Sequence, residues 1–276
     1  MSFYLVACIC KFDKVTDFAG GSNVVILALV TFGLSGLYSG RQIILTVLVT
    51  LWGLRLSGYL LTRILVIGVD KRFDGIRENP IKFLIFWIIQ MVWVYILALP
   101  VMFVNSPLAP SRNVGAVDIV GAVVFAGGLL FEAISDHVKF TFKLRNKGAT
   151  KGWCEVGPWR ISRHPNYFGE ICLWWGAFIV SATILERAKW IAVLTPVAVT
   201  CIILFVSGVP MLERSNDKKY GDDPEYQEYK RATPILVPGL PCCYRNVPSL
   251  IKVAFCCEFP FYANKRSEEE EAMGKR

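Results

Sequence analysis

The chain has 276 residues, of which 54% are hydrophobic and 19% are charged, and its formal net charge is +8. This composition is more apolar than that of a soluble domain of the same length and indicates an integral membrane protein. The basic residues do not form a soluble patch with interleaved aromatic side chains, so we expect no nucleic-acid partner.

Apolar runs divide the chain into membrane spans. Residues 2–10 are apolar but too short to cross a bilayer, and they lack the basic start of a signal peptide, so we expect no cleavage. Further on, several runs approach or exceed the roughly 20 residues that a span needs, which predicts about six spans, six or seven. We expect an all-α fold, a polytopic membrane helical bundle, with spans at 23–37, 42–61, 83–104, 114–134, 168–185 and 190–211.

The distribution of Lys and Arg predicts the orientation of these spans. With six spans, both termini and the even-numbered connections lie on one side, and that side collects most of the basic residues. Cytosolic loops carry such an excess, so both termini are predicted to be cytosolic. The opposite side holds only Arg41, Arg112, Arg187 and Lys189.

Two of the predicted spans carry ionisable side chains on one helical face. In the second span, Arg55 and Tyr59 are four residues apart, which is either charge anchoring of a helix end or a functional feature. In the fourth, Glu132 and Asp136 share a face that Lys139 continues. Pairs at this spacing contribute only tenths of a kcal/mol, whereas carboxylates near a membrane are costly. We therefore favour a ligand-binding role for Glu132 and Asp136.

Residues 162–170, which read SRHPNYFGE, form the most polar stretch of this chain and lie directly before an apolar run. A loop followed by an ordinary helix N-terminus would explain Pro165 and Glu170. However, a cation, an imidazole, a carboxamide, a phenol and a carboxylate at the end of a membrane helix indicate binding or reaction.

Further polar segments lie on either side of this stretch. The basic, glycine-bearing segment 143–159 could cradle phosphates. No G-x-G-x-x-G follows a strand, so a soluble dinucleotide-binding domain is not expected. Segment 213–220, taken alone, predicts an exposed amphipathic helix that meets the same cytosolic surface.

The spacing of the cysteines and the composition of the C-terminal region lead to three further predictions. None of the nine cysteines has zinc-site spacing, so no metal site is predicted. We predict a membrane domain over 1–238 and a cytosolic tail over 239–276 with an acidic run, 268–271, near its end. Cys242, Cys243, Cys256 and Cys257 are either palmitoylated or plain reduced thiols.

The run HPNYFGE at 164–170, with Asp136 upstream and the Lys143/Arg145 segment, resembles the C-terminal region of steroid 5α-reductases. That superfamily includes sterol C14 reductases and, more distantly, isoprenylcysteine carboxyl methyltransferases. The earlier pattern WGLRL at 52–56 looks like a branch of unassigned function within it. The resemblance implies NADPH held at cytosolic helix ends by Asp136, Lys143, Arg145, Arg163, His164, Asn166, Tyr167, Glu170, Glu213, Asp217 and Tyr220.

The resemblance also implies an activity, the reduction of an activated C=C bond in a lipid or steroid-like substrate, and a location in the endoplasmic reticulum. The reductases polarise their substrate with a Glu and a Tyr from N-terminal helices. The first three predicted spans hold no carboxylate, and we take Tyr59 and Glu132 as the catalytic candidates. The alternatives are S-adenosylmethionine-dependent methyl transfer and a non-catalytic protein that keeps the pocket. Asn166 and the Gly169-Glu170 pair favour the reductases.

Overall fold

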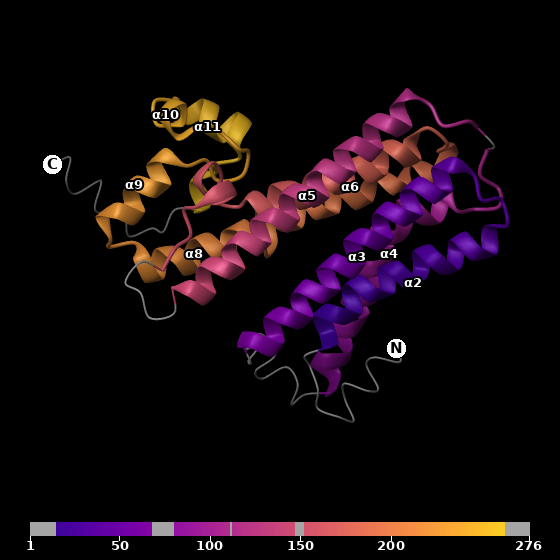
Figure 1. Cartoon of the computed structure of the whole chain (residues 1–276), viewed down its shortest axis with the longest axis horizontal. Coiled ribbons are helices and arrows are strands. Elements are labelled where there is room, and N and C mark those ends of the chain that lie inside the picture. Colours follow the sequence, from indigo (N-terminus) through magenta and orange to yellow (C-terminus); the bar gives the residue numbers. More distant parts are fainter. Residues whose placement is uncertain (1–14, 68–79, 111, 147–151, 263–276) are drawn as a thin grey trace. The chain divides into compact units, whose positions relative to one another are not determined.

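The computed structural model describes residues 15–67, 80–110, 112–146 and 152–262, and within these ranges the chain is helical and has no strand (Figure 1). The chain divides into two compact units. Unit 1 comprises Met1–Ala126 and Trp174–Pro196, and unit 2 comprises Gly127–Leu173 and Val197–Arg276. Helices α5 (Ala116–Arg145) and α6 (Pro165–Ala182) contribute residues to both. The segments 2–10 and 263–276 lie outside the described residues.

The lengths and composition of the helices support an integral membrane protein. Within the described residues, four helical segments are long and apolar enough to cross a bilayer: Gly40–Arg63, Phe83–Val104, Ala116–Arg145 and Arg187–Tyr220. A shorter apolar helix covers Gly20–Ser35. The predicted span 168–185 corresponds to α6, which is not among the four. The count of six spans and the cytosolic position of the termini therefore stay predictions.

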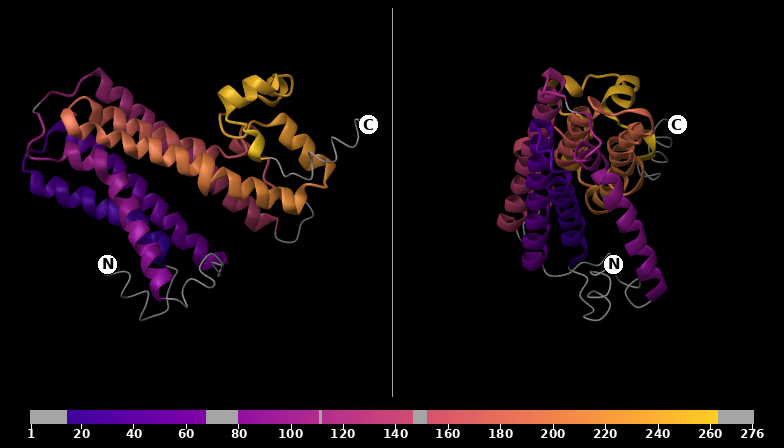
Figure 2. Two further views of the ribbon diagram at one scale, coloured as in Figure 1. Left: turned by 180° about the vertical axis from the view of Figure 1, so that it is seen from behind. Right: turned by 90° about the vertical axis from the view of Figure 1, so that its right-hand side faces the viewer.

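Unit 1 is built around three helices that run side by side, α2 (Val15–Ser35), α3 (Gly40–Ile67) and α4 (Pro80–Val104), as Figures 1 and 2 show. Glycines allow α2 and α3 to approach closely: a Cβ atom built on Gly53 would lie 3.0 Å from the Gly21 carbonyl oxygen. Such small-residue contacts are typical of membrane helix packing. Next to Gly53, the buried Trp52 packs edge-on against Trp174, with ring centroids 4.8 Å apart.

One end of unit 1 is fixed by a buried ion pair. The Arg41 guanidinium donates to both carboxylate oxygens of Asp118, with N–O distances of 2.6 and 2.8 Å. Asp118 also accepts from the Gly115 amide and the Thr183 hydroxyl. A buried pair persists only when its remaining hydrogen-bonding capacity is also satisfied. Arg41, counted from the sequence as a charge on the non-cytosolic side, is thus neutralised within the fold.

Unit 2 combines the C-terminal part of α5 and the first part of α6 with α8 (Val209–Tyr220) and α9 (Pro224–Ala232). Here the two long helices also meet through glycines, since a Cβ atom built on Gly169 would lie 2.6 Å from the Gly128 carbonyl oxygen. Before α8, the chain passes through the 3₁₀ turn Arg187–Val193, helix α7 (Leu194–Cys201) and a π-helical segment, Ile202–Val206.

Residues 239–262, which we call the C-terminal arm, pack against the rest of unit 2. The arm contains α10 (Pro241–Tyr244) and α11 (Ser249–Cys256), drawn in yellow in Figure 2. Its start is held by a hydrogen bond from the Gly239 amide to the Ile161 carbonyl oxygen, 2.9 Å. Its end is held by the Tyr262 hydroxyl, which donates to the Leu204 carbonyl oxygen at 2.6 Å.

Candidate functional site

The polar stretch 162–170 has the loop-to-helix form that its sequence predicts. Helix α6 begins at Pro165, and a 3₁₀ turn, Gly157–Arg160, precedes it. The segment after α9 holds this loop in place, because the Arg163 amide donates to the Pro234 carbonyl oxygen at 2.8 Å. The Ser162 hydroxyl likewise donates to the Leu236 carbonyl oxygen at 2.8 Å. These bonds fix the backbone from which Arg163 and His164 project.

A buried carboxylate gathers three side chains at this point. Glu213 of α8 lies 2.5 Å from an Arg163 guanidinium nitrogen, 2.8 Å from His164 Nε2 and 3.7 Å from Lys230 Nζ. The exposed fractions of Arg163, His164 and Glu213 are 4%, 1% and 2%. We call these four residues the Glu213 cluster. Ionic groups this deeply buried are stable only as mutually compensating partners.

The protonation of His164 follows from its surroundings. Burial lowers its pKa below the ordinary value of 6.5, although the hydrogen bond to Glu213 acts in the opposite direction. The imidazole is therefore neutral near pH 7, and its one N–H lies on Nε2 because the Glu213 carboxylate can only accept. His164 Nδ1 is then an acceptor.

Three buried polar atoms near the start of α6 have no hydrogen-bond partner in the structure. They are Arg163 Nε, His164 Nδ1 and Asn166 Oδ1, one donor and two acceptors. Buried polar atoms are nearly always bonded, so an unbonded group calls for an explanation such as an absent ligand or water. A ligand with both donor and acceptor atoms would satisfy all three.

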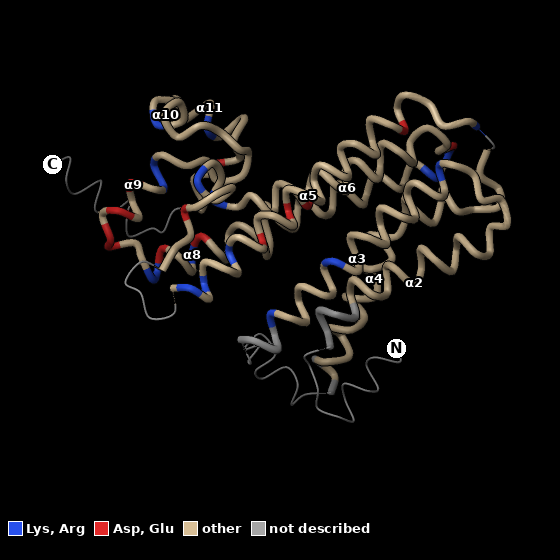
Figure 3. Tube along the Cα trace, viewed as in Figure 1, with Lys and Arg blue, Asp and Glu red and all other residues tan. Residues whose placement is uncertain are grey.

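A cavity of about 200 Å³ lies beside the Glu213 cluster. Among the described residues, its lining includes one carboxylate, that of Glu213, together with four basic and six aromatic side chains: Lys139, Lys143, Arg163, Lys219, Phe142, Trp153, Trp159, Tyr220, Tyr226 and Tyr229. We call it the basic cavity. Figure 3 shows the same mixture of charges along α8, α9 and the C-terminal part of α5.

The aromatic side chains of the basic cavity form a continuous wall. Trp153 contacts the rings of Tyr220 and Tyr226, with centroids 5.6 and 5.3 Å apart. The Lys139 ammonium lies over the Trp159 ring at 3.8 Å from its centroid, a cation–π contact. Burial raises the pKa of Tyr226 and Tyr229, so both phenols remain protonated donors. Burial also raises the pKa of the Cys154 thiol, which makes it a poor nucleophile.

The structure brings many of the predicted cofactor-binding residues together. Arg163, His164 and Glu213 are in contact, and Lys143 and Tyr220 line the basic cavity. Asn166 donates to Asp136 at 3.2 Å. The Tyr167 ring stacks on His164, with centroids 5.7 Å apart. Their function as NADPH ligands stays a prediction.

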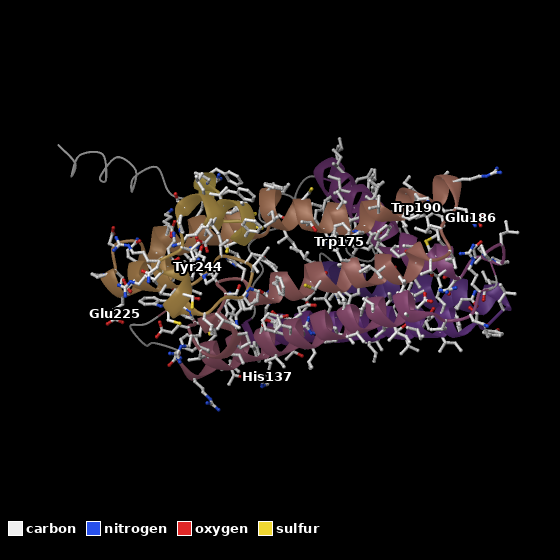
Figure 4. All side chains as sticks on the ribbon, turned by 90° about the horizontal axis from the view of Figure 1, so that it is seen from above. His137, Trp175, Glu186, Trp190, Glu225 and Tyr244 are labelled. Atoms are coloured by element: carbon white, nitrogen blue, oxygen red, sulfur yellow. The ribbon has the colours of Figure 1, made fainter. Side chains whose placement is uncertain are left out.

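Other predicted residues are placed differently. Arg145 lines a separate groove with His137, which is exposed and labelled in Figure 4. Asp217 pairs with Lys230 at 2.7 Å. Glu170 is half-buried on α6 and Glu132 is buried on α5. Tyr59 belongs to unit 1, where the Arg55 guanidinium lies 5.5 Å from its ring centroid.

The exposed amphipathic helix predicted for 213–220 is partly wrong. Helix α8 covers these residues, but Glu213 is buried because its carboxylate faces Arg163 and His164. Periodicity alone cannot reveal that a polar face is covered by partners from a distant loop.

Two contributors to the site were missed from the sequence. Trp159 supplies the ring beneath Lys139, and Glu258 of the C-terminal arm accepts from Arg163 at 2.7 Å. Glu258 could have been noticed because it is the one acidic residue between Glu228 and Glu268, within an apolar, aromatic segment.

Comparison with known protein families gives one match. The family DUF1295, whose description is protein of unknown function, matches residues 3–233. The chain belongs to DUF1295. The matched part of this DUF1295 protein includes the Glu213 cluster, whereas Glu258 and the rest of the C-terminal arm lie beyond it. Neither the curated proteins nor the solved structures include a significant match.

Proposed function

We propose that this DUF1295 protein is a membrane-embedded reductase that binds NADPH at unit 2 and reduces an activated C=C bond of a lipid or steroid-like substrate. By the same reasoning, it resides in the endoplasmic reticulum with the cofactor site facing the cytosol and six spans. The observation that supports this most is the basic cavity beside the Glu213 cluster, whose lining residue Arg163 has a buried Nε without a hydrogen-bond partner.

The charge of the cavity favours a phosphate-bearing ligand. Four basic side chains face it, and the one carboxylate in its lining is already compensated by Arg163. Arg and Lys bind phosphates through charge-assisted hydrogen bonds. At about 200 Å³ the cavity is smaller than the roughly 300–1,000 Å³ of complete ligand sites, so we assign it to part of a dinucleotide.

The aromatic wall and the residues at the start of α6 suit the other parts of such a ligand. Trp153, Tyr220 and Tyr226 offer ring faces for a base. Asn166 and His164 offer the acceptor atoms Oδ1 and Nδ1 to hydroxyl or amide groups. When bound, NADPH would supply a hydride to one carbon of the double bond. A proton for the other carbon would come from an acid, for which Tyr59 and Glu132 are our candidates.

A second function has an observation in its favour. The aromatic wall would also suit the sulfonium of S-adenosylmethionine, since aromatic rings attract such cations. The four basic side chains in the same lining oppose a cationic ligand, and we therefore rank the methyltransferase second. A non-catalytic protein that keeps the pocket is the third possibility.

Thermal denaturation of the purified full chain in detergent, with NADPH, NADP⁺ or S-adenosylmethionine, tests the proposal. NADPH is expected to raise the melting temperature by mass action. Lys143→Ala and Lys219→Ala, both at exposed residues of the cavity, should each weaken NADPH binding about tenfold. Lys218→Ala is the matched control, because Lys218 is an exposed neighbour of Lys219 on α8 that does not line the cavity.

The outcomes separate the three functions. Stabilisation by S-adenosylmethionine alone would replace the reductase by the methyltransferase. If no ligand stabilises the chain, the non-catalytic function is favoured. Equal loss of NADPH binding in Lys218→Ala and Lys219→Ala would contradict the assignment of the cofactor to the basic cavity.

A further inference from the structure

The guanidinium of Arg163 is already shared between two carboxylates. One terminal nitrogen lies 2.5 Å from Glu213, and the other lies 2.7 Å from Glu258. Arg163 also lines the basic cavity. An anion that enters the cavity and approaches Arg163 must therefore compete with one of these carboxylates.

The two carboxylates are not equally well held. Glu213 is 2% exposed and has three basic or imidazole partners, Arg163, His164 and Lys230. Glu258 is 29% exposed, and its contacts are with Arg163 and the Tyr244 hydroxyl. Burial raises the pKa of Glu258 although Arg163 acts against this. Glu258 is thus the carboxylate that an anion displaces more readily.

Glu258 is carried by the C-terminal arm, which begins after the residues that match DUF1295. The middle of the arm has little anchorage: α11 has no buried residue, and Leu250 and Phe255 are 81% and 74% exposed. Figure 4 labels Tyr244, the residue of α10 that contacts Glu258. Segments with few buried contacts open most easily, so the arm can withdraw while the rest of unit 2 stays folded.

The residue before Glu258 adopts an unfavourable backbone conformation. Cys257 has φ 59° and ψ 27°, the left-handed region that L-residues other than Gly, Asn and Asp rarely enter. This conformation turns the chain after α11 so that Glu258 reaches Arg163. Strained backbone of this kind persists where surrounding contacts impose it and occurs often at switch regions.

We propose that Glu258 is a built-in competitor for the anionic ligand of the basic cavity. The C-terminal arm holds the Glu258 carboxylate on Arg163 in the absence of ligand, and a ligand phosphate displaces it. The inference rests on the proposed function only in taking Arg163 as a phosphate contact. It requires neither NADPH nor reduction.

The experiment uses the purified full chain and inorganic pyrophosphate as the probe. Glu258→Gln removes the competing charge while Arg163 keeps Glu213, so pyrophosphate should bind about tenfold more tightly than to the unaltered protein. Glu186→Gln is the matched control, because Glu186 is an exposed residue of unit 1 that belongs neither to the C-terminal arm nor to the lining of the basic cavity. The control should leave the affinity unchanged.

Hydrogen exchange of the unaltered protein gives a second, independent measurement. Pyrophosphate should accelerate amide exchange in the C-terminal arm if its binding displaces Glu258. Equal pyrophosphate affinity in Glu258→Gln and the unaltered protein, without faster exchange of the arm, would overturn the inference. So would a complete failure of pyrophosphate to bind either protein. If Glu258→Gln does not fold, the exchange experiment decides alone.

NADPH in the same experiment distinguishes this inference from the proposed function. Release of the arm by pyrophosphate without any binding of NADPH would support the competitor and refute the cofactor. Binding of NADPH with an unchanged arm and unchanged affinity in Glu258→Gln would support the cofactor and refute the competitor.

Discussion

The side chain of Glu213 holds together residues from three parts of the chain, and its charge is what Arg163 and His164 share. Replacing it by Gln keeps the shape of the side chain but leaves the Arg163 charge, buried to 4% exposure, with less compensation. Removing one partner of a buried ion pair typically costs about 3–5 kcal/mol. We therefore expect Glu213→Gln to lower the free energy of unfolding by about 3 kcal/mol.

Thermal or denaturant unfolding in detergent measures this loss. Glu228→Gln serves as the control, since its partner Arg245 is 62% exposed and surface pairs contribute about 0–1 kcal/mol. Similar destabilisation by the two variants would show that Glu213 is not the centre of a buried cluster.

Because His164 is buried, we expect the stability of the folded protein to fall at acidic pH. Its pKa is lowered in the folded protein, chiefly by burial, from the ordinary 6.5. Below pH 6.5 the unfolded chain therefore binds a proton that the folded chain resists. The contribution to stability is complete above pH 6.5 and is lost as the pH falls below it, by up to about 1.4 kcal/mol per unit.

Melting temperatures between pH 7.5 and about 5.5 test this expectation. His164→Gln, whose amide can still donate to Glu213, should flatten the profile. The chain has two histidines, and His137→Asn at the exposed one should leave the profile as it is. A profile of His164→Gln that is superimposable on that of the unaltered protein would exclude His164 as the titrating group.

Two adjacent glycines of α5 allow the effect of helix packing on stability to be measured apart from the effect of helix propensity. A Cβ atom at Gly128 would lie 2.7 Å from the Gly169 carbonyl oxygen, whereas one at Gly127 would meet no described atom within 4 Å. Gly127→Ala should thus stabilise the helix by up to about 1 kcal/mol. Gly128→Ala should force α5 and α6 apart and destabilise the protein by about 1–3 kcal/mol.

Unfolding measurements on the two single variants compare these effects directly, because both substitutions add one methyl group to the same helix. Equal effects of the same sign would mean that α5 and α6 do not meet at Gly128.

The helices themselves were largely predictable from the pattern of apolar residues. The type of helix in each segment, 3₁₀, α or π, was not. The predicted span 190–211 comprises the end of a 3₁₀ turn, helix α7, a π-helical segment and the start of α8. Hydropathy reports apolarity and is insensitive to such changes. Gly208 permits the close approach after the π-helical segment, since a Cβ atom there would lie 2.5 Å from the Ile203 carbonyl oxygen.

The site was predictable to the extent that its chemistry is local in sequence. The polarity of residues 162–170 is visible in the sequence, and Arg163 and His164 do belong to the Glu213 cluster. Burial of Glu213 and the arrival of Glu258 depend on tertiary contacts between distant segments. No periodicity within either segment encodes those contacts.

For the whole molecule, the distribution of Lys and Arg predicts the orientation in the membrane, which the helices alone do not. An even number of spans would place both termini on one side, and the bias of Lys and Arg predicts that this side is cytosolic. Arg41 strengthens the argument, because its pairing with Asp118 removes one of the few positive charges assigned to the other side.

Labelling with a membrane-impermeant maleimide in sealed vesicles derived from the endoplasmic reticulum tests this topology, in a background with the nine cysteines changed to serine. A cysteine at Glu225, exposed in α9, should react in sealed vesicles whose cytosolic face is outward. A cysteine at Leu108, 83% exposed in the connection after α4, should react only after permeabilisation. Reaction of both in sealed vesicles would mean that the connection after α4 is cytosolic. In that case the charge bias of this chain would reflect ligand binding rather than orientation, and the basic residues would have to be accounted for by the basic cavity and its surroundings.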